Sequence, residues 1–249
     1  MAGVLAGQVA VVTGGSRGIG RACVLALAAE GADVVVNYVA NEEAAEACRA
    51  AAAALGVRAI AVRADVGDPA HARHLIATAE AELGRIDILV NNAGIARSRT
   101  ISRMSIEDWD DVIRTNLSSA FYCTHAAAPG MRERRYGRIV NIASMTGQHG
   151  YVGQASYTAA KAGMIALTQT TALELARFGI TANAVCPGSV ITDMSNVMTE
   201  EYRQGLLARI PLGRQASAEE IAASVVFLCG PGGAFYTGAQ LNPNGGQFM

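Results

Sequence analysis

The feature of this sequence that most constrains its fold is a glycine-rich loop directly after a short run of β-branched residues. Val9 to Val12 predicts a buried strand, and residues 13–20 then read TGGSRGIG before a helix continues from Arg21. Glycines at such positions permit a tight turn, close approach of the backbone to a pyrophosphate, and close packing of the helix on the strand. The pattern predicts a dinucleotide-binding unit with contacts from Gly14, Ser16, Arg17, Gly18, Ile19 and Gly20.

Further strand-like runs alternate with longer segments rich in Ala, Leu and Glu. The expected strands are Val9 to Val12, Val34 to Asn37, Ala59 to Arg63, Ile88 to Asn91, Arg138 to Ile142 and Thr181 to Val185. The expected helices begin near Ile19, Glu42, Ala70, Ser105, Tyr157 and Ala218. This alternation predicts an α/β fold, a Rossmann-type doubly wound parallel sheet of about seven strands with helices on both faces. Residues 1–249 are expected to form a single NAD(P)-binding catalytic domain, with a substrate-covering segment around 188–214.

The charge pattern of the chain argues against several classes of partner. Over 249 residues the formal net charge is -1, and no long basic block is present that could bind nucleic acid or anionic lipid. No run reaches the roughly eighteen apolar residues of a membrane span, and the first residues lack the basic start and cleavage site of a signal peptide. We therefore expect a cytoplasmic protein that acts on a small molecule, with neither nucleic acid nor membrane as a partner.

The cysteines and histidines do not show the spacing of metal ligands, so no metal is expected. The cysteines are odd in number and lack a CxxC pair, which indicates reduced thiols in the core. His71 and His74 are expected to be solvated on a helix, and His149 either lines the substrate pocket or is an exposed loop residue. The full set is Cys23, Cys48, Cys123, Cys186 and Cys229, with His71, His74, His125 and His149.

The end of the second strand bears on the choice of nicotinamide cofactor. An acidic residue there would bind the ribose hydroxyls of NAD, but the sequence reads Asn37-Tyr38. Neutral Asn37 and cationic Arg17 should accept the 2'-phosphate of NADP(H), which a carboxylate would repel. The alternative for Arg17 is a solvated loop charge. Asn37 and Tyr38 are therefore predicted to contact NADP(H).

Two more loops follow strands and fit the same ligand. Asp65-Val66 follows the third strand, where a carboxylate can accept from the adenine amino group, although Asp65 could equally cap the helix after Pro69. Residues 91–94 read NNAG and follow the fourth strand. Open α/β sheets bind ligands beyond the carboxyl ends of their strands. The predicted contacts are Asp65, Val66, Asn92, Ala93 and Gly94.

A tyrosine and a lysine four residues apart carry the candidate chemistry. Tyr157 and Lys161 share one face of the expected helix. A free phenol has a pKa near 10, and a neighbouring ammonium stabilises the phenolate, so Tyr157 could give a proton to a carbonyl oxygen at neutral pH. The spacing alone also fits a packed ring beside a solvated amine. Ser144, just past the fifth strand, favours the catalytic interpretation because its hydroxyl can hydrogen-bond a developing oxyanion.

Taken together, these motifs resemble the classical short-chain dehydrogenase/reductase family over nearly the whole chain. The resemblance rests on TGGSRGIG, NNAG, Asn116, Ser144, YTAAK and the Cys186-Pro187-Gly188 turn. It implies hydride transfer between a nicotinamide and a ketone carbon, with Ser144 holding the carbonyl and Tyr157 as general acid/base. It also implies that Lys161 lowers the pKa of Tyr157 and binds the nicotinamide ribose, and that Asn116 completes a water-linked proton relay. The nicotinamide-side loop would contribute Pro187, Gly188, Val190 and Thr192.

Within that family the chain is most similar to bacterial 3-oxoacyl-[acyl-carrier-protein] and acetoacetyl-CoA reductases, notably in residues 34–46 and 136–163. The first expectation is therefore NADPH-dependent reduction of a 3-oxoacyl thioester to the 3-hydroxyacyl thioester. A basic cluster before the fifth strand either meets an acidic acyl carrier protein or phosphopantetheine, or is a solvated face. Its members are Arg132, Arg134, Arg135 and Arg138.

Two departures from the carrier-protein reductases leave other functions open. Phe178 stands where those enzymes usually have a basic residue, with Arg177 one place earlier, and 242–244 reads NPN in place of a strand-like approach to the last glycines. One alternative is a reductase or dehydrogenase for free small ketones, cyclic alcohols or sugars. Another, from a different class, is a non-catalytic NADP-binding sensor. The resemblance also implies a homotetramer built through residues 105–129, 157–178 and the C-terminal segment, and the hydrophobic content of 51% fits buried subunit interfaces.

Overall fold

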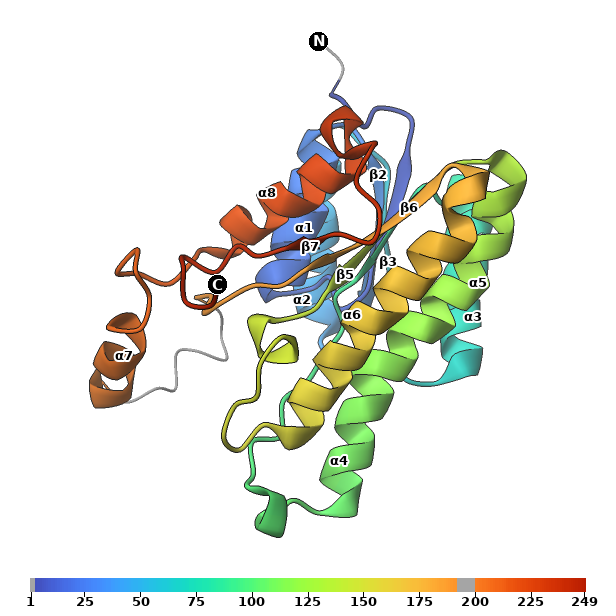
Figure 1. Cartoon of the computed structure of the whole chain (residues 1–249). Helices are drawn as coiled ribbons and strands as arrows, with labels where there is room; N and C mark the ends of the chain where they lie inside the picture. Colours follow the sequence, from blue (N-terminus) through green and yellow to red (C-terminus); the bar gives the residue numbers. More distant parts are fainter. Residues whose placement is uncertain (1–2, 192–199) are drawn as a thin grey trace.

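A parallel sheet of seven strands forms the centre of the computed structural model, which describes residues 3–191 and 200–249 (Figure 1). The strand order is β3-β2-β1-β4-β5-β6-β7. The direction of the order changes between β1 and β4, and open α/β sheets bind ligands at such a switch point. The strands are β1 (Val9–Val12), β2 (Asp33–Tyr38), β3 (Ala59–Arg63), β4 (Ile88–Asn91), β5 (Gly137–Ile142), β6 (Ile180–Val185) and β7 (Gln240–Leu241).

Helices cover both faces of this sheet, so the predicted doubly wound α/β fold is confirmed (Figure 1). On one face lie α1 (Gly18–Ala29), α2 (Glu42–Ala53) and α8 (Ala218–Cys229). On the other lie α3 (Pro69–Leu83), α5 (Ser119–Arg134) and α6 (Ala155–Leu175), with α4 (Ile106–Ile113) against α6. Helix α7 (Glu200–Leu207) stands apart from the sheet. Across residues 3–191 and 200–249, no helix combines the length and the apolar character needed to span a membrane.

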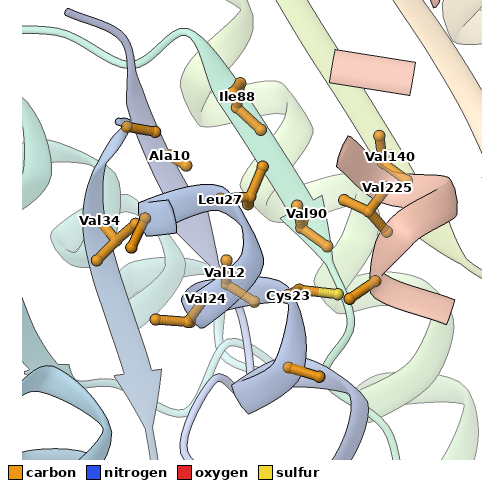
Figure 2. Close-up of a cluster of buried hydrophobic side chains, with 14 of the residues drawn as sticks. Ala10, Val12, Cys23, Val24, Leu27, Val34, Ile88, Val90, Val140 and Val225 are labelled. Carbon is orange, nitrogen blue, oxygen red and sulfur yellow. The ribbon is translucent and has the colours of Figure 1, made fainter. Parts of the chain in front are cut away.

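Most strand residues are apolar because the sheet is covered on both faces. Every residue of β1, β4, β5 and β6 is buried. Figure 2 shows one core cluster, in which Val12 and Val90 of the sheet meet Leu27 of α1 and Val225 of α8. The cysteines are all buried free thiols, as expected, and burial raises the pKa of Cys23 to about 12.

Local signals explain where the helices begin. Asp68 caps α3, because its Oδ1 accepts from the backbone nitrogens of Ala70 at 2.7 Å and His71 at 3.0 Å. The alternative of Asp65 as this cap is therefore wrong, since its own Oδ1 accepts from Gly67 N at 3.0 Å. At the start of α8, Ser217 and Glu220 form a reciprocal capping box.

The structure departs from the expected elements at three places, one of which is α7, a helix that was not among those expected. The helix expected from Ser105 is interrupted by a π-helix over Arg114–Ser118, which separates α4 from α5. About seven strands were expected, but the position of β7 was not predicted, because two residues are too few to show a pattern of alternation. The first residues of the other expected strands and helices agree closely with the structure. The largest difference is at α6, which begins at Ala155 rather than near Tyr157.

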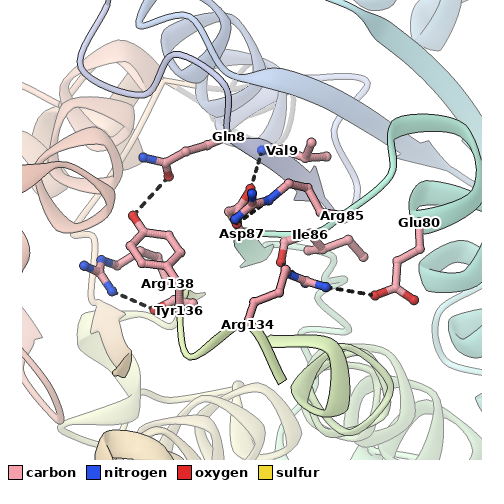
Figure 3. A network of polar contacts seen from close by, with 10 residues as sticks. Gln8, Val9, Glu80, Arg85, Ile86, Asp87, Arg134, Tyr136 and Arg138 are labelled. Atoms are coloured by element: carbon pink, nitrogen blue, oxygen red, sulfur yellow. Dashed lines mark hydrogen bonds and ion pairs between the residues drawn. The ribbon is translucent and has the colours of Figure 1, made fainter. Parts of the chain in front are cut away.

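A buried carboxylate anchors the amino-terminal edge of the sheet (Figure 3). Asp87 is fully buried just before β4, and its Oδ2 accepts from Val9 N of β1 at 3.0 Å. Its Oδ1 accepts from Arg85 Nη2 at 2.6 Å and from Nε at 3.0 Å. Arg134 donates to Ile86 O at 2.7 Å, which attaches the end of α5 to the same edge. The two central strands are thus joined outside their own ladder of backbone hydrogen bonds.

The substitution Asp87→Ala should lower the free energy of unfolding by about 3 kcal/mol, because it removes both acceptor oxygens and leaves a buried N–H unpaired. Urea denaturation followed by circular dichroism measures the change. The control is Glu46→Ala, which breaks an exposed pair with Arg49 three residues away and should cost less than about 0.5 kcal/mol. Equal losses in the two variants would contradict an anchoring role for Asp87.

Candidate active site

The glycine loop after β1 leaves the first turn of α1 open to a ligand. Gly14 and Gly18 have φ angles of +62° and +53°, which side chains on L-residues rarely tolerate. Arg17 stands at the N-cap position without a side-chain hydrogen bond, so the first amide N–H groups of α1 have no capping acceptor. Outward amides at a helix N-terminus are the donor set that a pyrophosphate requires. The loop therefore fits the phosphates of a dinucleotide, as predicted for its residues.

The NNAG loop after β4 is tied directly to the glycine loop. Thr13 Oγ1 accepts from the backbone nitrogens of Asn92 at 2.9 Å and Ala93 at 3.0 Å. Asn92 Nδ2 donates to the carbonyl oxygens of Thr13 at 2.9 Å and Gly14 at 3.1 Å. A Cβ added to Gly20 would lie 2.2 Å from Gly14 O and 2.5 Å from Asn92 Nδ2. Gly20 is therefore required by the close approach of these two loops.

Asn37 has a structural role that the sequence did not reveal. Its side chain is buried, its Oδ1 accepts from Gly14 N at 3.1 Å, and its Nδ2 donates to Ala64 O at 2.9 Å. Tyr38 is also buried and packs in the core beside α1 and α2. Asn37 thus acts on the glycine loop from beneath, and direct contact of these two side chains with a cofactor stays a prediction.

Two exposed arginines lie where β2 and its neighbours end. Arg17 is exposed on the glycine loop. Arg63, the last residue of β3, is paired in register with Tyr38 and donates from Nε to Val39 O at 3.1 Å. Sequence reasoning missed Arg63, although a basic residue at the end of a strand next to β2 was the available signal.

The side chains of Asp65 and Val66 lie in different environments, one near the surface and the other in the core. Asp65 Oδ2 pairs with Arg114 Nη1 at 3.0 Å, which connects the loop after β3 to the π-helix. The Val66 side chain is buried in the core beneath α3. A contact of this pair with an adenine stays a prediction, and the Asp65 carboxylate is the more accessible of the two.

Ser144, Tyr157 and Lys161 come together at the carboxyl end of β5, as the sequence predicted. Ser144 Oγ accepts from Thr146 N at 3.2 Å and from Thr146 Oγ1 at 3.0 Å, and Ser144 is hydrogen-bonded to Tyr157. Lys161 is buried, and its Nζ donates to Ile142 O at 2.6 Å. The same Nζ lies 5.6 Å from the centroid of the Tyr157 ring.

Burial dominates the titration of this pair. It lowers the pKa of Lys161 from 10.5 to about 8. It raises the pKa of Tyr157 above its usual value, and only the hydrogen bond with Ser144 opposes that increase. The lowering of the phenol pKa by Lys161 stays a prediction.

Asn116 is buried inside the π-helix, and both polar atoms of its side chain bind one residue. Asn116 Oδ1 accepts from Ile95 N at 2.7 Å, and its Nδ2 donates to Ile95 O at 2.9 Å. A Cβ on Gly94 would lie 3.3 Å from Asn116 Oδ1. The side chain thus holds the chain just after NNAG, and its place in a proton relay stays a prediction.

The loop after β6 closes the other side of the cluster. Pro187 O accepts from Met145 N at 3.0 Å, which joins this loop to the residue after Ser144. A Cβ on Gly188 would lie 2.9 Å from Asn244, and Val190 forms an isolated bridge with Ala216. Thr192, the last predicted member of this loop, lies outside the described residues. His149 is half-buried, and its ring stacks on Phe248 with centroids 4.5 Å apart.

A family model described as short chain dehydrogenase matches residues 8–203 of this chain. The chain belongs to the short-chain dehydrogenase family. Its relatives include the 3-oxoacyl-[acyl-carrier-protein] reductase of Synechocystis sp., 48% identical over 246 residues, and FabG of Escherichia coli K12, 44% identical over 243 residues. Each alignment covers 98% of both chains. A solved blue fluorescent protein from a metagenomic library, in complex with NADPH, has a TM-score of 0.93 at 39% identity, covering 98% of this chain and 99% of that one.

As a short-chain dehydrogenase, the protein is an oxidoreductase that acts on CH–OH groups and binds a nicotinamide cofactor. The uncapped helix terminus and the glycine loop described above fit that cofactor. Among residues 3–191 and 200–249, no group of three or more His, Cys, Asp or Glu side chains is placed to hold a metal ion.

The buried lysine of this short-chain dehydrogenase makes its stability depend on pH. The pKa of Lys161 is about 8 in the fold against 10.5 in its ordinary state, so between these values the unfolded chain binds more protons. Stability from this group therefore rises with pH through that window and is lost as pH falls through about 8. We compare the Tm of the cofactor-free wild-type protein with the Tm of the Lys161→Met variant. The difference, wild type minus variant, should increase from about pH 7 to about pH 10. Differential scanning fluorimetry measures it, and a constant difference would show that Lys161 is not desolvated.

Proposed function

We propose that this protein is an NADPH-dependent reductase that converts a 3-oxoacyl thioester to the 3-hydroxyacyl thioester. The observation that carries the proposal is the cluster of Ser144, Tyr157 and Lys161, in which a tyrosine hydroxyl bonded to a serine stands beside a buried ammonium. Together with a glycine loop at the switch point of the same sheet, this cluster supplies both a proton donor and a place for the cofactor.

In the proposed reaction, Tyr157 gives its proton to the ketone oxygen, with no metal ion taking part. Because Ser144 Oγ already accepts two hydrogen bonds from Thr146, its own hydrogen is available to donate toward Tyr157 or toward the substrate oxygen. Lys161, held by Ile142 O, supplies positive charge next to the phenolate that remains after proton transfer. When bound, the nicotinamide supplies the hydride and, after oxidation, a second positive charge.

The remaining predicted residues receive supporting roles in this proposal. Gly14, Ser16, Gly18, Ile19 and Gly20 line the pyrophosphate, and Asp65 faces the adenine. Lys161 also binds the nicotinamide ribose. The loop of Pro187, Gly188, Val190 and Thr192 borders the nicotinamide. Because the Asn116 side chain is occupied by Ile95, we place its contribution to a proton relay at its backbone, inside the π-helix.

A preference for NADP(H) over NAD(H) is supported by charge. Strand β2 ends in Asn37 and Tyr38 without a carboxylate, while Arg17 and Arg63 bring exposed guanidinium groups to the same edge of the sheet. A 2'-phosphate carries close to two negative charges, which guanidinium groups accept and a carboxylate would repel. The proposal therefore assigns Arg17 and Arg63 to the 2'-phosphate.

Arg17→Ala should reduce the ratio of kcat/KM for NADPH to that for NADH by about tenfold or more, the usual value of a charge-assisted hydrogen bond. Steady-state rates with the two cofactors measure the ratio. Arg49→Ala, on the exposed side of α2, is the control and should leave it unchanged. An unchanged ratio in Arg17→Ala would mean that this side chain is only a solvated loop charge.

The thioester substrate is supported by relatives such as those of Synechocystis sp. and Escherichia coli, which are named 3-oxoacyl-[acyl-carrier-protein] reductases. Free small ketones, cyclic alcohols or sugars remain the alternative within the same chemistry. A non-catalytic NADP-binding sensor would have no need of a tyrosine placed between a serine and a buried lysine.

We propose an acidic acyl carrier protein as the partner of the basic cluster. Fewer of the predicted arginines are available to this partner than the sequence suggested. Arg134 and Arg138 turn inward, since Arg134 donates to Ile86 O and Arg138 is buried over the Tyr136 ring. Arg132 and Arg177 instead both lie over the Phe178 ring, with guanidinium carbons 4.5 Å and 4.8 Å from the ring centroid. Arg135 donates to Arg177 O at 3.0 Å. Within the described residues, Arg132, Arg135 and Arg177 are not paired with a carboxylate.

We propose a homotetramer with one catalytic domain per chain. Strands from both ends of the sequence share one sheet, which supports a single domain over residues 1–249 with a covering segment at 188–214. Apolar side chains are exposed on the helices expected at subunit contacts, including Trp109 of α4, Phe121 of α5 and Leu173 of α6. Buried thiols of raised pKa fit a cytoplasmic location.

Tyr157→Phe should lower kcat by about 10²–10⁴-fold while leaving the Kd for NADPH nearly unchanged, because only the proton donor is lost. The assay follows NADPH oxidation with acetoacetyl-CoA, a carrier-bound 3-oxoacyl chain, and simple aryl or cyclic ketones. Tyr136→Phe, at the opposite edge of the sheet, is the matched control and should keep normal turnover. Near-normal kcat in Tyr157→Phe would refute the role, and a preference for simple ketones would favour the alternative substrate class.

A further inference from the structure

The last residues of the chain fold into a compact turn after β7, which we call the C-terminal turn (Asn242–Phe248). Asn244 closes it, because its Nδ2 donates to Phe248 O at 2.6 Å and its Oδ1 accepts from Gly246 N at 2.9 Å. Gln247 N also donates to Asn244 O at 3.0 Å. Asn244 is buried, so the turn is held by satisfied internal hydrogen bonds and presents a defined surface.

One side chain of the C-terminal turn holds the loop after β6. Gln247 Oε1 accepts from Ser189 N at 3.0 Å, and Pro243 O accepts from Gly188 N at 3.3 Å. A Cβ on Gly188 would lie 2.9 Å from Asn244 Cα and from Gln247 Oε1, so the two backbones are in direct contact. This is the loop whose Pro187, Gly188 and Val190 are proposed to border the nicotinamide.

A second side chain holds the loop that follows Ser144. The rings of Phe248 and His149 stack with centroids 4.5 Å apart and an interplanar angle of 14°. His149 Nδ1 lies 2.9 Å from Met145 O, and because a carbonyl can only accept, Nδ1 must carry the hydrogen. Phe248 therefore acts through His149 on Met145, the residue next to Ser144.

The C-terminal turn also contacts the covering segment. Gly245 O accepts from Leu212 N at 3.1 Å. Gly245 and Gly246 have φ angles of +62° and +82°, and a Cβ on Gly246 would lie 2.9 Å from Pro211 Cγ. The turn is thus in contact with the loop after Ser144, through His149, and with two stretches of the 188–214 segment, through Gly188–Ser189 and Pro211–Leu212.

We propose that Gln247 and Phe248 are positioning residues for the reaction and act on its two halves separately. Gln247 positions the nicotinamide-side loop through Ser189 N, and Phe248 positions the substrate-side loop through His149. The inference rests on the proposed function, because that function places the nicotinamide beside the loop after β6 and the ketone at Ser144, the residue before Met145. Since the two side chains contact different loops, their loss has different kinetic consequences, which a general loss of stability would not produce.

Phe248→Ala raises KM for the 3-oxoacyl substrate about three- to tenfold, the value of one stacked aromatic pair, with the Kd for NADPH unchanged. Phe248→Tyr keeps a ring of the same shape and restores KM. The matched control is Met249→Ala, since the neighbouring Met249 is 98% exposed and its removal leaves the kinetics unchanged. His149→Ala combined with Phe248→Ala raises KM no further than either substitution alone, because both break the same contact.

Gln247→Ala has the opposite effect on the two constants, because it changes the Kd for NADPH rather than KM for the ketone. It raises the Kd for NADPH about three- to tenfold, the usual range for one hydrogen bond, while KM for the ketone at saturating NADPH changes less than twofold. Gln247→Glu retains an oxygen acceptor for Ser189 N and restores cofactor binding in a fluorescence titration. Equal effects of Gln247→Ala and Phe248→Ala on both constants would overturn the assignment of separate roles.

Hydrogen exchange separates this inference from the proposed function. In the cofactor-free protein, amide exchange in residues 145–149 accelerates in Phe248→Ala relative to Met249→Ala, whereas exchange in 187–190 accelerates in Gln247→Ala. If the wild-type protein reduces no ketone, the proposed function fails while these exchange rates still test the contacts. If turnover is normal but exchange and kinetics match those of Met249→Ala, the positioning roles are overturned and the proposed function stands.

Discussion

A buried ammonium group governs the arrangement of the candidate site. Lys161 donates to the carbonyl of Ile142, which joins the first turns of α6 to the end of β5 and fixes the helix in the register that sets Tyr157 against Ser144. Removing a cation from water is costly, and the lowered pKa of Lys161 reflects that cost. The extensive core on both faces of the sheet supplies the stability that lets such a group persist at the candidate site.

Polar side chains with backbone partners shape the loops around this ammonium. Thr13 and Asn92 join the glycine loop to the loop after β4, Asn37 supports the glycine loop from beneath, and Asn116 holds Ile95. Each of these side chains is wholly or partly buried, so its hydrogen bonds are costly to break and favour a single loop conformation. A site made of loops can be preorganised for catalysis only when such contacts fix their geometry.

Local patterns explain which parts of the fold were predictable. The strands were predictable because they are short, apolar and bounded by turns, and the helix starts because capping and amphipathic patterns are local. The π-helix at Arg114–Ser118 was not, since its apolar spacing cannot be told from that of an α-helix. Asn37 was correctly placed at a strand end, yet its side chain is turned inward to backbone groups of the glycine loop and of the chain after β3, contacts that only the paired sheet creates.

The sequence by itself determined the doubly wound sheet, the glycine loop and the choice of three candidate reactive side chains, because periodicity and motif spacing are properties of the chain alone. Only the tertiary structure decided that Lys161 faces a carbonyl, that Arg63 joins Arg17 at one edge, and that Phe248 stacks on His149. Those contacts join residues far apart along the chain. Their existence depends on how strands align and how helices cross them, and no local pattern of residues encodes that geometry.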